Sequence, residues 1–215
     1  MVGTSEWLVA TEAKYGGLQT NIPRNTVSAH DPRSKRELAT GGMIGGDRMS
    51  AEQHNYGDTY AMFLKPFLLR DPQSLTVIEI GILKGTGLAI WADLFPGCTL
   101  IGLDIDLDHI RKNMAFLKAR GAFSHGDPIL HEFDQFNDNR GLLAGILSGR
   151  KADIVMDDGF HTEEPIIRTF RSVEPHLADA FVYFVEDDFD AASYLPVKLP
   201  EYSIRSIGEI SVVTR

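Results

Sequence analysis

The sequence predicts an α/β fold in which a doubly wound, mostly parallel seven-stranded sheet ends in a C-terminal antiparallel hairpin. Three observations lead to this prediction. Short apolar, β-branched runs alternate along the chain with longer segments of helical character, as in repeated β/α units. A glycine-rich turn follows the first of these runs. Most of the runs end in carboxylates, at the edge where an open α/β sheet binds its ligands.

Length and composition restrict the class of protein. The chain has 215 residues, of which 43% are hydrophobic, and this suffices for one sizeable domain. Its formal net charge of -9 disfavours nucleic acid and anionic membrane surfaces as partners, because both attract basic proteins. Because Cys98 is the only cysteine, the chain has neither an internal disulfide nor a cysteine-based zinc cluster.

The expected location is the cytoplasm. The first eight residues lack the basic start and the long apolar run of a signal peptide. No apolar run in the chain is long enough to cross a bilayer. The single cysteine also fits a reducing compartment.

The first 50 residues are expected to form a poorly patterned lead-in to the main domain, which we place at residues 51–215. Two glycine pairs and two prolines interrupt any long element in the lead-in. Such a segment acts as a lid, forms the contact of a homo-oligomer, or is a partly mobile tail. The sequence leaves these alternatives open.

Aromatic residues precede an apolar helix that we expect over residues 61–69. His54, Tyr56 and Tyr60 either attach this helix to the sheet or form a rim that contacts cofactor or substrate, and the sequence favours neither role. Pro66 should bend or interrupt the helix.

The stretch from Thr76 to Gly87 organises the rest of the chain. Its first half is a β-branched, apolar run typical of a strand buried on both faces. Its second half is rich in glycine and leads into a helix over residues 88–95, so that backbone N–H groups and a helix N-terminus face a ligand. The spacing, which begins at Glu79, is acidic-x-Gly-x-x-x-Gly-x-Gly. Asp104 ends the next apolar run, where a carboxylate can accept hydrogen bonds from both hydroxyls of a ribose.

The remaining elements continue the β/α alternation. They are a helix over 107–120, a strand over 128–133, a helix over 141–149, a strand over 151–156, a helix over 163–177, a strand over 180–185 and a hairpin over 202–214. Together with the two earlier strands, they complete the predicted sheet.

Carboxylates gather at the predicted carboxyl edge of this sheet. They are Glu79, Asp104, Asp134, Asp157, Asp158, Glu186 and Asp187. Such a group repels itself unless protons or a cation neutralise it. A hard divalent ion with oxygen ligands is the natural partner, and Mg²⁺ fits best, with Mn²⁺ as an alternative. The competing interpretation is a set of solvated loop carboxylates and helix caps.

The acidic-glycine turn together with Asp104 resembles the class I S-adenosylmethionine-dependent methyltransferases, whose fold is Rossmann-like. The resemblance implies that the turn passes under the methionine part of the cofactor, that Asp104 holds the ribose and that Asp134 meets the adenine amino group. The cofactor-binding residues implied in this way are Glu79, Gly81, Gly85, Asp104, Asp134, Gln135, Asp157 and Tyr56.

A narrower resemblance covers about residues 45–190. Segments 157–161 (Asp-Asp-Gly-Phe-His) and 184–187 (Phe-Val-Glu-Asp) look like those of the metal-dependent sugar O-methyltransferases of macrolide biosynthesis. Gly-Gly-Asp-Arg at 45–48, followed by His-x-Tyr-x-x-x-Tyr, is similar to a segment of the same group. In this sequence Phe160 replaces the small residue expected before the histidine, and Asp188 adds a further acid.

This resemblance implies a catalytic apparatus. Asp158, Glu186 and Asp187 would be the metal ligands, and His161, or Asp158 itself, would be the catalytic base. The sulfonium methyl is already activated, so the enzyme must make an alcohol nucleophilic and align it in line with the C–S bond. A metal that binds two adjacent hydroxyls lowers the pKa of the attacking one.

The expected function is therefore Mg²⁺-dependent transfer of a methyl group from S-adenosylmethionine to a hydroxyl of a sugar or glycoside. The acceptor would be a small molecule or an oligosaccharide with vicinal hydroxyls. A catechol-type phenolic O-methyltransferase is the main alternative, because it also uses Mg²⁺ and a vicinal diol. A nicotinamide-dependent oxidoreductase, which the glycine spacing disfavours, and a noncatalytic cofactor-binding protein are the others.

Overall fold

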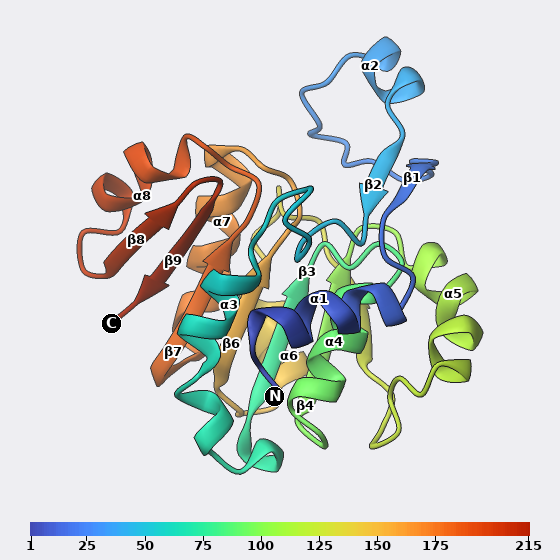
Figure 1. Ribbon diagram of the computed structural model, residues 1–215. Helices are drawn as coiled ribbons and strands as arrows, with labels where there is room; N and C mark the ends of the chain where they lie inside the picture. The colour runs from blue at the N-terminus through green and yellow to red at the C-terminus, as the bar shows by residue number, and fades with distance from the viewer.

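A computed structural model describes all residues, 1–215, and its centre is a seven-stranded sheet with the strand order β5-β4-β3-β6-β7-β9-β8 (Figure 1). The strands are β3 (Thr76–Ile80), β4 (Thr99–Asp104), β5 (Ile129–Glu132), β6 (Ala152–Asp157), β7 (Leu177–Val185), β8 (Ser203–Ile207) and β9 (Ile210–Thr214). Strands β3 to β7 are parallel, whereas β9 runs antiparallel to both β7 and β8. The predicted doubly wound sheet with a C-terminal hairpin is confirmed.

Helices cover both faces of this sheet. They are α1 (Ser5–Lys14), α3 (Gly57–Leu64), α4 (Thr86–Leu94), α5 (Asp108–Ala119), α6 (Arg140–Leu147), α7 (Glu163–Val173) and α8 (Ala191–Lys198). Helices α1, α3, α4 and α5 contribute to a core cluster of 28 buried residues, and α6, α7 and α8 to a second cluster of 21. Val77 belongs to the first cluster and Ile78 to the second, as the two-residue period of a doubly buried strand requires. None of the helices combines the length and the apolar character that crossing a membrane requires.

Prolines explain where several helices end or differ from expectation. Pro66 separates α3 from a 3₁₀ turn at Phe67–Leu69, as predicted. Pro175 lies inside the helix expected to reach residue 177, and α7 instead gives way to a 3₁₀ turn at Glu174–His176. Helix α8 is not predicted from the sequence, because its interior contains Pro196, which usually interrupts a helix.

The first 45 residues contain more regular structure than their pattern predicts. Helix α1 begins after the N-cap residue Thr4 and packs against α3 and α4. Strands β1 (Gln19–Ile22) and β2 (Met43–Gly45) form a separate antiparallel sheet, and α2 (Lys35–Thr40) lies between them in the chain. In Figure 1, these three elements stand apart from the main sheet. The domain boundary at residue 50 and a lid or oligomer role for this segment stay predictions.

The sheet has a switch point at β3. The chain proceeds from β3 to β4 and β5 on one side, and then crosses back to add β6 and β7 on the other. In open α/β sheets, ligands bind outside the carboxyl ends of the strands at such a point. The topology therefore places a ligand site where β3, β4 and β6 end.

Candidate functional site

A cavity of about 720 Å³ opens at the carboxyl ends of strands β3 to β7. Its lining combines residues at the strand ends with the N-terminal segment between residues 22 and 48. The predicted site residues that line it are Glu79, Gly81, Asp104, Asp134, Gln135, Asp158, His161, Glu186 and Asp187. The fold thus brings together most of the residues that the sequence pattern singles out, from five separate strand ends.

The glycine turn between β3 and α4 is shaped by the groups that lie against it. Gly81 has a φ of 82°, and a Cβ at this position would press on the backbone carbonyl of Asp158. A Cβ at Gly87 would meet the carboxylate of Glu79. Close approach of these neighbours therefore requires glycine at both positions, and the backbone of the turn lines the cavity.

Asp104 supports this turn from the end of β4. Its Oδ2 accepts a hydrogen bond from the backbone N–H of Leu83 at 2.9 Å, and its Oδ1 accepts one from Asp106 at 2.9 Å. Leu83 has a φ of 42°, which is uncommon for leucine and is supported by this bond. Burial raises the pKa of Asp104, and the backbone N–H donors oppose that rise. Each carboxylate oxygen keeps a second lone pair for another donor.

The end of β5 carries two polar side chains with fixed partners. Asp134 accepts a hydrogen bond from the Ser28 hydroxyl at 2.7 Å, which attaches the N-terminal segment to the sheet. Gln135 accepts one from the backbone N–H of Phe160 at 2.5 Å, so its side chain holds the loop after β6. Phe160, which departs from the expected pattern, packs edge-on against Phe136.

The residues predicted to contact the cofactor that do not line the cavity are Gly85, Asp157 and Tyr56. Gly85 adopts a left-handed conformation at the start of α4 and lies against α5. Both oxygens of Asp157 accept hydrogen bonds, from the Gln135 amide and the Tyr183 hydroxyl, and burial raises its pKa to about 6. Tyr56 donates to Oδ1 of Asp187 at 2.6 Å. Asp157 and Tyr56 therefore contact other residues of the site, whereas Gly85 shapes the start of α4.

Arg48 lies at the centre of the charged part of the site. It precedes α3 and is 7% exposed. Its Nη1 donates to Glu79 at 2.8 Å, its Nη2 to Asp158 at 2.5 Å and its Nε to Glu186 at 2.7 Å. Burial raises the pKa of Glu79 to about 7 and also raises those of Asp158 and Glu186, and Arg48 opposes each rise. The sequence pattern includes Arg48 in a motif but indicates no role for it.

Asp158, His161 and Asp187 form a group that could hold a cation, because their ligand atoms all lie within 4.8 Å of one another. Nδ1 of His161 is 3.1 Å from the backbone oxygen of Glu186. A carbonyl only accepts, so Nδ1 carries a hydrogen, and in the neutral ring the lone pair is on Nε2, which is 3.9 Å from Oδ1 of Asp158. Asp187 has a φ of 56°, a strained conformation of the kind that clusters at functional sites.

Glu186 lies outside this group. It is 1% exposed, and its Oε2 accepts from Nε of Arg48. Its Oε1 accepts from the hydroxyl of Tyr60. The fold therefore brings the three predicted metal ligands to one edge of the sheet, but only Asp158 and Asp187 present ligand atoms to each other.

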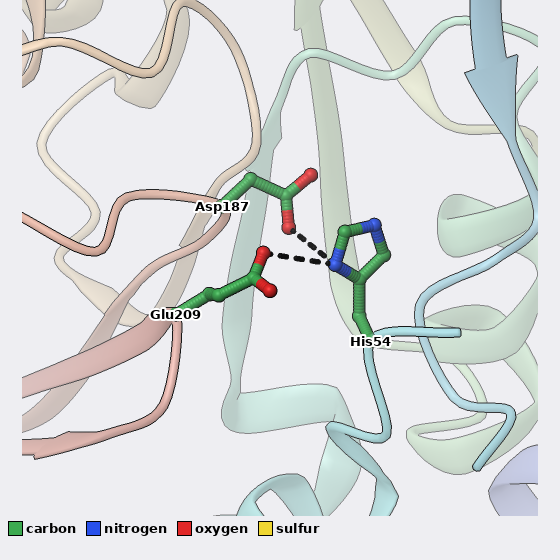
Figure 2. A group of neighbouring side chains, drawn as sticks. All are labelled: His54, Asp187 and Glu209. Carbon is green, nitrogen blue, oxygen red and sulfur yellow. Dashed lines mark hydrogen bonds and ion pairs between the residues drawn. The ribbon is translucent and has the colours of Figure 1, made fainter. Parts of the chain in front are cut away.

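A second cluster joins the N-terminal half of the chain to the C-terminal hairpin (Figure 2). Nδ1 of His54 lies 3.3 Å from Oδ1 of Asp187 and 3.2 Å from Oε2 of Glu209. Its Nε2 lies 3.5 Å from Asp47. The contact with Asp47 raises the pKa of His54 to about 9, and Asp187 and Glu209 add to the rise. The raised pKa favours the protonated ring, which pairs with the carboxylates around it.

Known proteins resemble this chain in structure and not in sequence. No family model matches the chain, and no curated protein matches it. Among solved structures, MycE methyltransferase from the mycinamycin biosynthetic pathway, in complex with Mg and SAH, is 19% identical with a TM-score of 0.56. The match covers 77% of this chain and 50% of MycE, so the chain spans about half the length of that protein.

Two further structures match over larger shares of their own chains. A putative caffeoyl-CoA O-methyltransferase from Staphylococcus aureus is 10% identical with a TM-score of 0.51, over 72% of this chain and 83% of its own. A putative O-methyltransferase from Klebsiella pneumoniae is 12% identical with a TM-score of 0.51, over 98% of this chain and 88% of its own. At such low identities, the structural similarity shows the fold alone. The chain has the Rossmann-like fold of the S-adenosylmethionine-dependent methyltransferases, as predicted.

Proposed function

We propose that this chain is an S-adenosylmethionine-dependent O-methyltransferase that requires a divalent cation, Mg²⁺ by preference, and acts on a hydroxyl of a sugar or glycoside. The observation that carries the proposal is the grouping of Asp158, His161 and Asp187 beside a cavity at the strand ends of a methyltransferase fold. MycE structures contain Mg and SAH, and one also contains mycinamycin VI, which supports a small-molecule acceptor here.

The cavity offers groups that fit the cofactor. Asp104 has lone pairs available for the ribose hydroxyls, and Asp134 lies at the strand end that would face the adenine. Oε2 of Glu79 is buried without a hydrogen-bond partner on a residue that lines the cavity, and a cationic amino group would satisfy it. When bound, S-adenosylmethionine supplies a methyl group that is already activated for transfer.

The donor set fits a hard divalent ion. Asp158 and Asp187 offer the carboxylate oxygens that Mg²⁺ and Mn²⁺ prefer. When bound, such an ion lowers the pKa of a coordinated hydroxyl. Acceptors with adjacent hydroxyls would be favoured, because two substrate oxygens could bind the ion together with the carboxylates of Asp158 and Asp187.

His161 is the residue best placed to remove the proton from the acceptor. The backbone oxygen of Glu186 holds the Nδ1 hydrogen and orients the ring, which leaves the Nε2 lone pair on the side of Asp158. A positioned general base accelerates a reaction by about 10²–10⁴-fold. Asp158 is the alternative base, but one of its oxygens is already bound to Arg48.

Chelation tests the cation requirement. We expect EDTA to abolish methyl transfer and added Mg²⁺ or Mn²⁺ to restore it, while binding of S-adenosylhomocysteine, measured by calorimetry, survives the chelator. Full activity in EDTA would refute the metal mechanism. Loss of cofactor binding in EDTA would show that the cation site and the cofactor site are not separate.

Substitution of the histidine tests the base. His161→Ala should reduce turnover by about 10²–10⁴-fold and leave binding of S-adenosylhomocysteine in place. His125→Ala is the matched control, because His125 is exposed and lies outside the cavity. An acceptor panel of glycosides and catechols then separates the substrate classes, and methyl transfer to catechols alone would assign the chain to the phenolic class.

A further inference from the structure

We propose that Arg48 is the permanent counter-ion of Glu186, so that the divalent cation of this chain binds Asp158 and Asp187 without Glu186. The inference rests on the proposed cation-dependent function and specifies which carboxylates take part in it. It makes Glu186 and Arg48 positioning residues, and it differs from the three-carboxylate ligand set that the sequence resemblance implies.

The first argument is that both oxygens of Glu186 already accept hydrogen bonds from buried donors. Its side chain is 2% exposed, its Oε2 lies 2.7 Å from Nε of Arg48, and its Oε1 accepts a hydrogen bond from the hydroxyl of Tyr60. Tyr60 is itself fully buried and packs against Trp91 and Phe184. A cation that displaced either donor from Glu186 would leave a buried polar group unpaired, which is costly.

The second argument is that Arg48 is held in place independently of Glu186. Oε1 of Glu12, from helix α1, accepts a hydrogen bond from the backbone N–H of Arg48 at 3.1 Å, and Oε2 accepts one from Met49 at 3.0 Å. The guanidinium also binds Glu79 and Asp158, so all of its nitrogens have carboxylate partners. Withdrawing this side chain would leave three carboxylates without their cation, which strongly destabilises a buried ionic network.

The third argument concerns the two oxygens of Asp158. Oδ2 lies 2.5 Å from Nη2 of Arg48, whereas Oδ1 lies 3.9 Å from Nε2 of His161. Arg48 thus binds one side of the carboxylate and leaves the other toward His161 and Asp187. The same guanidinium therefore satisfies Glu186 and orients Asp158 for the cation. Because Arg48 also places a positive charge beside the cation site, it weakens the attraction of that site for a divalent ion.

A titration with Mn²⁺ tests the ligand set without measuring activity. The electron paramagnetic resonance signal of the free ion reports how much Mn²⁺ is bound. The protein is the full chain with S-adenosylhomocysteine present. Asp158→Asn and Asp187→Asn should each weaken Mn²⁺ binding by about tenfold or more, because each removes a direct carboxylate ligand. Glu186→Gln, which has the same shape, should weaken binding several-fold less than either aspartate variant does, because the lost charge acts on the cation only from a distance and through Arg48. Asp179→Asn, at a fully exposed position, is the matched control.

Arg48 variants test the counter-ion directly. Arg48→Met should bind Mn²⁺ about tenfold more tightly, because the competing positive charge is gone and Glu186 becomes available. Arg48→Lys should stay close to the wild-type affinity, because it retains the charge. A residue that only stabilised the fold would not produce a tighter metal site when removed. If Arg48→Met does not fold, as judged by circular dichroism, the difference in Mn²⁺ affinity between Glu186→Gln and Asp187→Asn still shows whether Glu186 is a ligand.

The outcomes separate this inference from the proposed function. If Glu186→Gln weakens Mn²⁺ binding as much as Asp187→Asn does, Glu186 is a ligand and the inference is wrong, while the cation-dependent function stands. Unchanged or weaker Mn²⁺ binding by folded Arg48→Met would also overturn it. If the wild-type chain binds no Mn²⁺, or if Asp158→Asn and Asp187→Asn have no effect, the cation site itself is refuted and the inference falls with it.

Discussion

Replacing Asp104 with alanine tests whether this carboxylate holds the ribose of the cofactor. In the structure its two oxygens accept hydrogen bonds from the backbone N–H groups of Leu83 and Asp106, at 2.9 Å each. Alanine removes the charge and all acceptor positions, so the cofactor loses a pair of charge-assisted bonds and the strained turn at Leu83 loses its support. We expect binding to weaken by about 1–3 kcal/mol, or roughly 5- to 150-fold.

Calorimetry with S-adenosylhomocysteine measures this loss. Asp104→Asn separates charge from shape, and it should fall between the wild type and Asp104→Ala because one amide oxygen remains as an acceptor. Asp108→Asn, in the first turn of α5 and outside the cavity, is the matched control. A thermal unfolding curve for each variant distinguishes a damaged site from a damaged fold. Unchanged affinity of folded Asp104→Ala would remove Asp104 from the ribose site.

Three other features can be tested by stability and exchange measurements. Gly81→Ala should lower the free energy of unfolding by about 1–3 kcal/mol in urea titrations, because a Cβ there meets backbone at positive φ; Gly141→Ala, with open space around it, is the control and should show no loss. His54 has a pKa raised from 6.5 to about 9, so it stabilises the folded state fully below pH 6.5 and loses this contribution as the pH rises through 9. The stability difference between the wild type and His54→Gln should therefore shrink over that range, and a constant difference would contradict the ion-pair cluster. If the segment 19–45 closes over the cofactor, its amide exchange should slow when S-adenosylhomocysteine binds, and identical exchange in both states would leave only a structural role.

The buried strands, the glycine turn and the set of strand-end carboxylates could be predicted because they depend on local sequence. A short β-branched apolar run indicates a buried strand. The carboxyl ends of parallel strands all lie at one edge of the sheet. Asp104, Asp158 and Asp187 therefore came together as expected at the cavity. The sequence does not predict helix α1, because its apolar face is weakly patterned and the helix is stabilised by packing on α3 and α4.

Tertiary structure alone determines which hydrogen-bond partner each of the neighbouring carboxylates has. Adjacent residues at a strand end point to opposite faces, so Asp157 meets Tyr183 while Asp158 meets Arg48 and the cavity. Glu186, which follows β7, also accepts a hydrogen bond from Arg48.

Arg48 could not be predicted as their common partner, since it lies 31, 110 and 138 residues from Glu79, Asp158 and Glu186 in the chain. The sequence by itself determined that acids would gather at one edge of the sheet. Only the folded chain determined which of them receive a buried counter-ion and which are left for a ligand, because burial removes water and makes each acid depend on whichever donor the fold places beside it.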